Sequence, residues 1–174
     1  MQFDINKSIT ILQRTPEVMK VLLLGLNEDW TEKNEGPETF SPFDVVGHLI
    51  HGEKTDWRVR ATLILEHGTE KPFEPYDRFA QFRFSEGRTL EELLKEFASL
   101  RSENIRWLES LHLSHADLDK KGIHPELGEV SLRQLLSTWV VHDLTHIAQV
   151  TRVMAKQYRD EIGPWVGYFR IMSF

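Results

Sequence analysis

The segment from Ser131 to about Gln157 decides the fold, and at its centre stands Val141-His142-Asp143-Leu144-Thr145-His146. Apolar residues and the two histidines recur at alternating intervals of three and four, which predicts a helix with one inward-facing side. The positions on that side are Leu132, Leu135, Trp139, His142, His146, Gln149 and Val153. Two imidazoles on a buried side need partners, because a buried polar group without one costs about 1–3 kcal/mol.

His142 and His146 are four residues apart, so on a helix they project from the same side, one turn apart. This spacing can hold two positions of one metal's coordination sphere. Spacing alone is equally compatible with core histidines that have satisfied hydrogen bonds, or with a helix turned so that both histidines face water. A third histidine at a compatible position would favour the metal.

The composition is that of a globular protein in one domain, residues 1–174. Hydrophobic residues make up 40% of the chain and charged residues 28%, as in ordinary soluble domains. The net charge of −6 argues against nucleic acid as a partner. No apolar run of membrane length or signal-like segment is found, so no membrane partner is expected. The absence of cysteine excludes thiolate ligands and a cysteine nucleophile, and is consistent with the cytoplasm.

Four segments carry apolar residues at helical spacing, and no alternating strand of useful length appears. Helices are expected over residues 3–26, 42–66, 90–111 and 131–157. The last three begin with capping residues, Ser41, Thr89 and Ser131. In the first, Thr15-Pro16 predicts a kink or a new helix beginning at Pro16. The sequence therefore predicts an all-α four-helix bundle.

Two long connections, residues 67–88 and 112–130, are expected to cover one end of this bundle. In the second, Ile123-His124 and Glu129-Val130 could form a short extended pair. Its histidines, His112, His115 and His124, are interpreted as surface residues. The apolar tail 165–174 is too hydrophobic to stay in water, so it should dock on the bundle or on a second subunit. With the long apolar first helix, it predicts a homodimer.

The third histidine is His48, in the helix expected over 42–66. It falls on the edge of the apolar side of that helix, whereas His51 lies about 60° further out. His48, His142 and His146 would leave a fourth coordination position free, which is the layout of a catalytic zinc-type site. Imidazole suits Zn, Ni, Fe and Cu, so the ligands do not select one metal.

Four polar residues could support these ligands from behind. Glu53 and Asp56 follow His48 by one to two turns and could orient an imidazole or transfer a proton, although ordinary ion pairing is favoured for both. Asp143 lies about 100° around the helix from His142, behind the ligands or on the surface. Gln149 lies on the same helix side as His146. No serine-hydrolase elbow, phosphate-binding loop or His-Glu-x-x-His motif is present.

The segments Gly47-His48-Leu49-Ile50-His51-Gly52-Glu53 and Val140-Val141-His142-Asp143-Leu144-Thr145-His146-Ile147-Ala148-Gln149, with the order of the helices, resemble the DinB-like superfamily of metalloproteins, which includes YfiT-type hydrolases. The resemblance extends over nearly the whole chain, and the two histidine-containing helices are its specific part. It implies an up-down-down-up bundle with one metal-binding histidine on the second helix and two on the last. These positions match His48, His142 and His146.

The resemblance also implies one divalent transition metal, with Zn or Ni favoured, and frequent homodimers. Characterised relatives include thiol S-transferases that use bacillithiol or mycothiol, and a thiol-dependent isomerase. The leading hypothesis is a metal-dependent enzyme acting on a small molecule, either a transferase for a low-molecular-weight thiol such as bacillithiol or a hydrolase that activates water. The alternative is a non-enzymatic, metal-stabilised stress-response or interaction protein. The free coordination position favours the enzyme.

Overall fold

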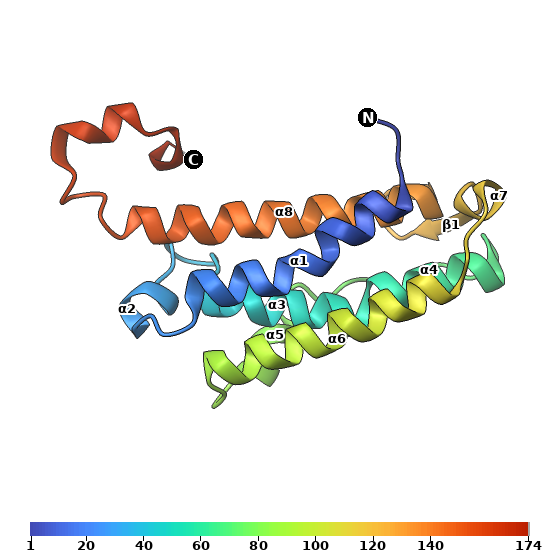
Figure 1. Ribbon diagram of the computed structural model, residues 1–174, viewed down its shortest axis with the longest axis horizontal. Helices are drawn as coiled ribbons and strands as arrows, with labels where there is room; N and C mark the ends of the chain where they lie inside the picture. The colour runs from blue at the N-terminus through green and yellow to red at the C-terminus, as the bar shows by residue number, and fades with distance from the viewer. Residues whose placement is uncertain (174) are drawn as a thin grey trace.

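The computed structural model describes residues 1–173, and four long helical elements packed side by side form its body (Figure 1). They are α1 (Ile5–Leu23), α3 (Pro42–Thr55) continued by α4 (Trp57–His67), α6 (Leu90–Ser110) and α8 (Leu132–Lys156). α1 and α8 run in one direction, α3–α4 and α6 in the other. The predicted up-down-down-up four-helix bundle is confirmed.

Short elements occupy the connections between these helices. They are α2 (Glu28–Thr31), α5 (Ala80–Ser85), α7 (His115–Leu118), β1 (Lys121–His124), β2 (Gly128–Ser131), η1 (Gly163–Tyr168) and η2 (Arg170–Met172). β1 and β2 form an antiparallel hairpin in which Ile123 lies opposite Glu129, which confirms the expected extended pair. Within residues 1–173, no helix has the length and apolar character needed to cross a membrane.

The capping residues read from the sequence begin three of the four long elements. Ser41, Thr89 and Ser131 each accept a hydrogen bond from the backbone N–H three residues on, and the side chain at that position in turn accepts a hydrogen bond from the cap's N–H. Each reciprocal pair satisfies two backbone donors that a helix start leaves without partners. The starts of the second, third and fourth bundle helices are therefore set locally.

The second helix is not continuous, contrary to the expectation for residues 42–66. It breaks at Asp56, whose backbone angles of φ −111° and ψ −79° depart from helical geometry, and resumes at Trp57. Gly52 makes room for this turn, since a side chain there would meet the Trp57 indole nitrogen at 3.1 Å. The break brings Trp57 into the bundle, where its ring stacks on Trp139 at 5.7 Å between centroids.

The first helix is continuous through Pro16, so the predicted alternative of a new helix beginning at that residue is wrong. A proline has no N–H, and therefore the Leu12 carbonyl, four residues earlier, lacks its usual helical donor. The Arg101 guanidinium replaces that donor, with 2.7 Å between Nη1 and the Leu12 oxygen. A contact from another helix thus satisfies the carbonyl that proline leaves free.

Two apolar clusters fill the bundle. One is centred on Leu12, Trp57, Leu108 and Trp139, towards the hairpin, and the other on Met19, Val46, Phe97 and Val150. Buried polar residues lie between the two clusters along the helices: Thr15, Glu53, Arg101, Asn104, Asp143 and His146.

Arg101 is the centre of this polar layer and is almost completely buried. Its guanidinium donates to Glu53 Oε1 from Nε at 3.0 Å and Nη2 at 2.7 Å. It also donates to Asp143, with distances of 2.5 and 3.0 Å. Glu53 further accepts from Asn104 at 2.9 Å and Trp139 at 3.2 Å. With the Leu12 carbonyl, this network joins all four bundle elements.

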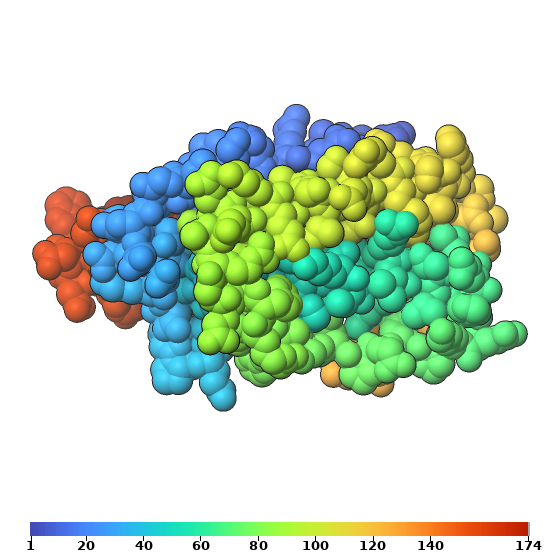
Figure 2. Space-filling model, turned by 90° about the horizontal axis from the view of Figure 1, so that it is seen from below, coloured from blue at the N-terminus to red at the C-terminus, as the bar shows by residue number. Residues whose placement is uncertain are grey.

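The connections lie along one side of the bundle, and not over one end as expected from the sequence, because α5 packs against the side of α3. α5 packs on α3 at Gly47, where a side chain would come within 2.5 Å of the Ser85 hydroxyl oxygen. Figure 2 shows the green segment around residue 70 lying along α3–α4. After α8 the chain projects beyond the end where α2 lies (Figures 1 and 2). In this tail Met172 is buried, while Trp165 and Tyr168 are exposed; Phe174 lies outside the described residues.

We predict that Arg101→Met lowers the free energy of unfolding by about 3–5 kcal/mol, because it leaves Glu53 and Asp143 buried without their cation. Urea denaturation followed by circular dichroism would measure the loss. Arg106→Met is the matched control, since Arg106 is exposed on the same helix. A loss below about 1 kcal/mol from Arg101→Met would show that the network is not the main link between the helices.

The expected homodimer stays a prediction. An exposed apolar groove on the outer surface of α1 and α8 supports it. Val18 and Val21 on α1 and Ile147 on α8 line an apolar groove there, and Val21 is 76% exposed. We expect light scattering to give the mass of a dimer at micromolar concentration, and Val21→Glu to give a monomer. Val59→Glu, at an exposed position on α4, should leave the dimer intact. A wild-type monomer throughout that range would contradict the prediction.

Candidate metal centre

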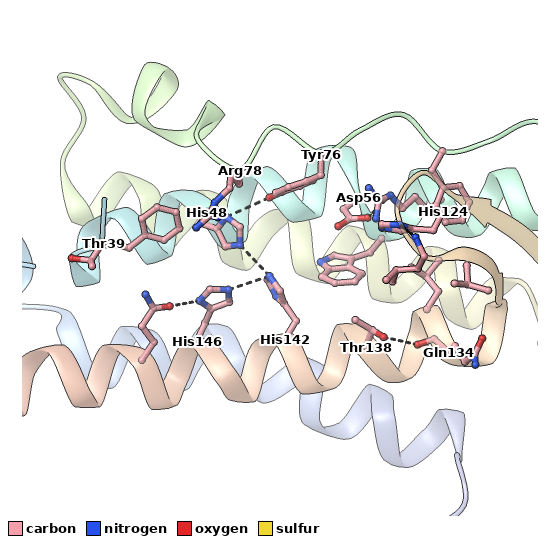
Figure 3. Close-up of a pocket in the computed structure, with 18 of the residues that line it drawn as sticks. Thr39, His48, Asp56, Tyr76, Arg78, His124, Gln134, Thr138, His142 and His146 are labelled. Carbon is pink, nitrogen blue, oxygen red and sulfur yellow. Dashed lines mark hydrogen bonds and ion pairs between the residues drawn. The ribbon is translucent and has the colours of Figure 1, made fainter. Parts of the chain in front are cut away.

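Three histidine side chains from two helices meet near the middle of the bundle (Figure 3). His48 comes from α3, and His142 and His146 come from successive turns of α8. One ring nitrogen of each lies within 4.8 Å of the others. The Nε2 atom of His142 is 3.1 Å from Nε2 of His48 and 3.1 Å from Nε2 of His146. The structure therefore brings together the three residues proposed as ligands.

Burial keeps two of these imidazoles neutral at physiological pH. His48 and His146 are 8% and 9% exposed. Burial, followed by the neighbouring histidines, lowers the pKa of His48 to about 2. Burial and then His142 lower the pKa of His146 to about 4. A neutral imidazole has a free lone pair on one nitrogen, and this is the form that binds metal ions.

The hydrogen bond behind His146 indicates where its lone pair points. Its Nδ1 atom lies 2.8 Å from the Gln149 side-chain oxygen, which can only accept, so Nδ1 carries the proton. The lone pair is then on Nε2, which faces the other two histidines. Gln149, a candidate from the sequence, thus orients one of the three candidate ligands.

Behind His48, the Tyr76 hydroxyl lies 3.4 Å from Nδ1. Burial raises the pKa of Tyr76, and the carboxylate of Asp56 adds to this effect, so the hydroxyl stays protonated. Tyr76 is not among the site residues predicted from the sequence. Its only signal was a place in the aromatic-rich connection 67–88, and nothing local relates that residue to His48.

Asp143 lies next to the third histidine, His142, and is buried and not on the surface. Burial opposes its ionisation, but the charge and hydrogen bonds of Arg101 are stronger, and the pKa of Asp143 is lowered. Its carboxylate lies 4.0 Å from His142 Nδ1, a buried nitrogen without a hydrogen-bond partner. Two carboxylates around Arg101, those of Glu53 and Asp143, leave a net negative charge beside the three histidines.

Glu53 and Asp56 have different roles from each other. Glu53 faces Arg101, Asn104 and Trp139, away from the imidazoles, so its ion pair is structural. Asp56 lines the cavity in front of the histidines and pairs with Arg60, with 2.8 Å between the carboxylate and Nε. Burial raises the pKa of Asp56 although Arg60 acts in the opposite direction.

The group does not include His51, His112, His115 or His124. The ring of His51 packs against Tyr76, with 4.8 Å between centroids. His124 lines the cavity, but its Nδ1 accepts hydrogen bonds from the backbone N–H groups of Glu126 and Leu127 in the hairpin turn. His112 and His115 do not line the cavity.

A cavity of about 650 Å³ opens in front of the three histidines. The connection 67–88 contributes Phe73, Tyr76 and Arg78 to its wall, and the connection 112–130 contributes His124, Leu127 and Val130. The connection between α2 and α3 adds Glu35, Glu38, Thr39 and Phe40. All three connections therefore meet at this side of the bundle.

The donor set fits a divalent metal ion. Tetrahedral zinc with nitrogen ligands at about 2.0–2.1 Å has neighbouring nitrogens about 3.4 Å apart, close to the observed 3.1 Å between Nε2 atoms. Without a cation, converging lone pairs repel one another. The three nitrogens lie at a cavity wall, which leaves one side for an exogenous ligand.

We predict that purified protein binds about one divalent ion per chain, and that alanine at position 48, 142 or 146 lowers the affinity by at least about tenfold. Metal analysis after dialysis and competition with a chelator would measure this. His51→Ala and His124→Ala serve as controls, since neither histidine belongs to the group of three. A loss with His51→Ala and none with His48→Ala would reverse the assignment of the ligand on α3.

Comparison with known proteins relates both the fold and the sequence of this chain to a family. The structure is similar to YfiT from Bacillus subtilis, described as "a probable metal-dependent hydrolase with an unusual four-helix bundle topology". The TM-score is 0.72 at 20% sequence identity, over 90% of this chain and 86% of that one, which shows a shared fold. No curated protein matches the sequence. The sequence profile of the DinB superfamily matches residues 11–150, and the chain therefore belongs to the DinB superfamily.

Proposed function

We propose that this protein is a metal-dependent enzyme that acts on a small molecule by hydrolysis or by transfer to a thiol. The observation that carries the proposal is the convergence of three histidine nitrogens on the wall of a 650 Å³ cavity. A metal that only stabilises a fold is normally enclosed by four protein ligands, whereas catalytic sites keep one position open. Cavities of about 300–1,000 Å³ are typical of small-molecule sites.

His48, His142 and His146 would hold the ion, and Gln149 and Tyr76 would keep two of the imidazoles in their binding orientation. A divalent ion in this position supplies Lewis acidity, which lowers the pKa of a coordinated water or thiol towards neutrality. The net negative charge around Arg101 favours a cation here.

Asp56 is the residue placed to handle a proton in the cavity. Its raised pKa makes it a stronger base than an ordinary aspartate, and its ion pair with Arg60 fixes the carboxylate. Tyr76, with its raised pKa, can donate or accept a hydrogen bond but does not ionise near neutral pH. We assign Asp56 as the candidate proton acceptor from the incoming nucleophile.

The likeness to YfiT supports hydrolysis. Thiol transfer is the second candidate, which the volume of the cavity supports, because a small thiol and an electrophile can both enter 650 Å³. Since the chain has no cysteine, the thiol must be a second substrate, such as bacillithiol. Zn and Ni are the metals proposed, and the cytoplasm is the proposed compartment.

We expect turnover to require the metal and to rise with pH through the pKa of the activated water or thiol. Removal of the metal should abolish activity, addition of Zn²⁺ or Ni²⁺ should restore it, and His146→Ala should be inactive while remaining helical by circular dichroism. The assay is a panel of esters and electrophiles, each with and without added small thiols. Strict dependence on thiol would identify a transferase, and turnover in water alone a hydrolase. No turnover by metal-loaded protein in any combination would favour a non-enzymatic binding protein.

A further inference from the structure

We propose that the substrate is a small apolar molecule with one carboxylate, which Arg78 binds beside the three histidines. This inference rests on the proposed function, because the substrate would bind in the same cavity. The charges that line the cavity are the observation that leads to it.

Three arginines line the cavity, and two of them are neutralised by carboxylates. Arg60 pairs with Asp56 at 2.8 Å, and Arg152 pairs with Glu35 at 2.6 Å. The guanidinium of Arg78 stacks over the Phe79 ring, 5.0 Å from its centroid. Within residues 1–173 it has no hydrogen bond and no ion pair. The neighbouring carboxylate of Asp77 pairs with Arg83 instead, at 2.5 Å.

Arg78 lies close enough to the candidate metal site for its positive charge to act on that site. Figure 3 shows it next to His48, on the side of the cavity opposite α8. With a divalent ion on the histidines, a guanidinium here adds a second positive charge to the same space, and the two repel each other. An anion that occupies the space between them removes the repulsion and gains charge-assisted hydrogen bonds from the guanidinium. The third carboxylate of the lining, that of Glu38, forms no ion pair with Arg78 within residues 1–173. The guanidinium of Arg78 is therefore available to the single charge of a bound carboxylate.

The rest of the cavity indicates what the carboxylate is attached to. Trp57, Phe73, Leu135 and the hairpin residue Val130 give the cavity an apolar wall. The charges of Asp56 and Arg60 in the same region compensate each other. This wall would bury a hydrocarbon or aromatic group, while the carboxylate stays at Arg78.

The test compares two ligands of nearly the same size and shape, the charged 4-phenylbutanoate and the neutral 4-phenylbutanamide. Binding is measured by calorimetry with metal-loaded protein and again after the metal is stripped. We expect wild type to prefer the carboxylate in both states. Arg78→Gln should weaken carboxylate binding by at least about tenfold, the value of one charge-assisted hydrogen bond, and should change amide binding by less than about twofold.

Arg58→Gln is the matched control, because Arg58 also stacks over an aromatic ring, that of Trp107 at 5.3 Å, but does not line the cavity. It should leave the binding of both ligands unchanged. If Arg78→Gln leaves the preference for the carboxylate as it is in wild type, or if the preference disappears when the metal is removed, the metal and not Arg78 holds the anion and the inference is wrong. These measurements do not need turnover, so a failure of the proposed catalysis would be seen separately.

Discussion

The guanidinium of Arg101, buried at the centre of the bundle, is in contact with the Leu12 carbonyl of α1, Glu53 of α3 and Asp143 of α8. Removing such a cation from water is expensive, and its ion pairs offset that cost only if nearly every donor has a partner. Here two carboxylates and one backbone carbonyl accept from it, and Asn104 and Trp139 satisfy Glu53 further. The contacts hold only when the four helices lie in one relative position along their axes. Apolar packing alone would tolerate small shifts between helices more readily.

That relative position also decides whether the candidate metal site exists. Asp143 is next to His142 in sequence, and Glu53 is five residues after His48. The helices α3 and α8 therefore contribute both the carboxylates that pair with Arg101 and the candidate ligands. A shift of α3 against α8 would break the contacts with Arg101 and separate the histidine nitrogens, which lie 3.1 Å apart between His48 and His142. The rigid polar layer fixes the relative position of α3 and α8, and with it the positions of the candidate ligands.

The connections between the helices supply much of the cavity wall in front of the three histidines. Tyr76 and Arg78 reach the histidines from the segment before α5, and the hairpin forms the far wall of the cavity. Gly47 lets α5 pack closely on α3, which holds this segment against the bundle. The helices thus carry the candidate ligands, while the connections form the cavity wall in front of them. This division is common in proteins whose loops carry specificity on a rigid scaffold.

The sequence by itself determined the helices and the candidate ligands, because those signals are local. Apolar periodicity and capping residues such as Ser41 and Ser131 act within a few residues, and the spacing of His142 and His146 is a property of one helix. Only the tertiary structure decided that Pro16 stays inside a helix, since the donor to Leu12 comes from a residue 89 positions away. The same holds for Glu53 and Asp143, whose partner Arg101 lies 48 and 42 positions away, and for Tyr76 behind His48. Contacts of this range depend on how whole helices pack, and no pattern within one helix contains that information.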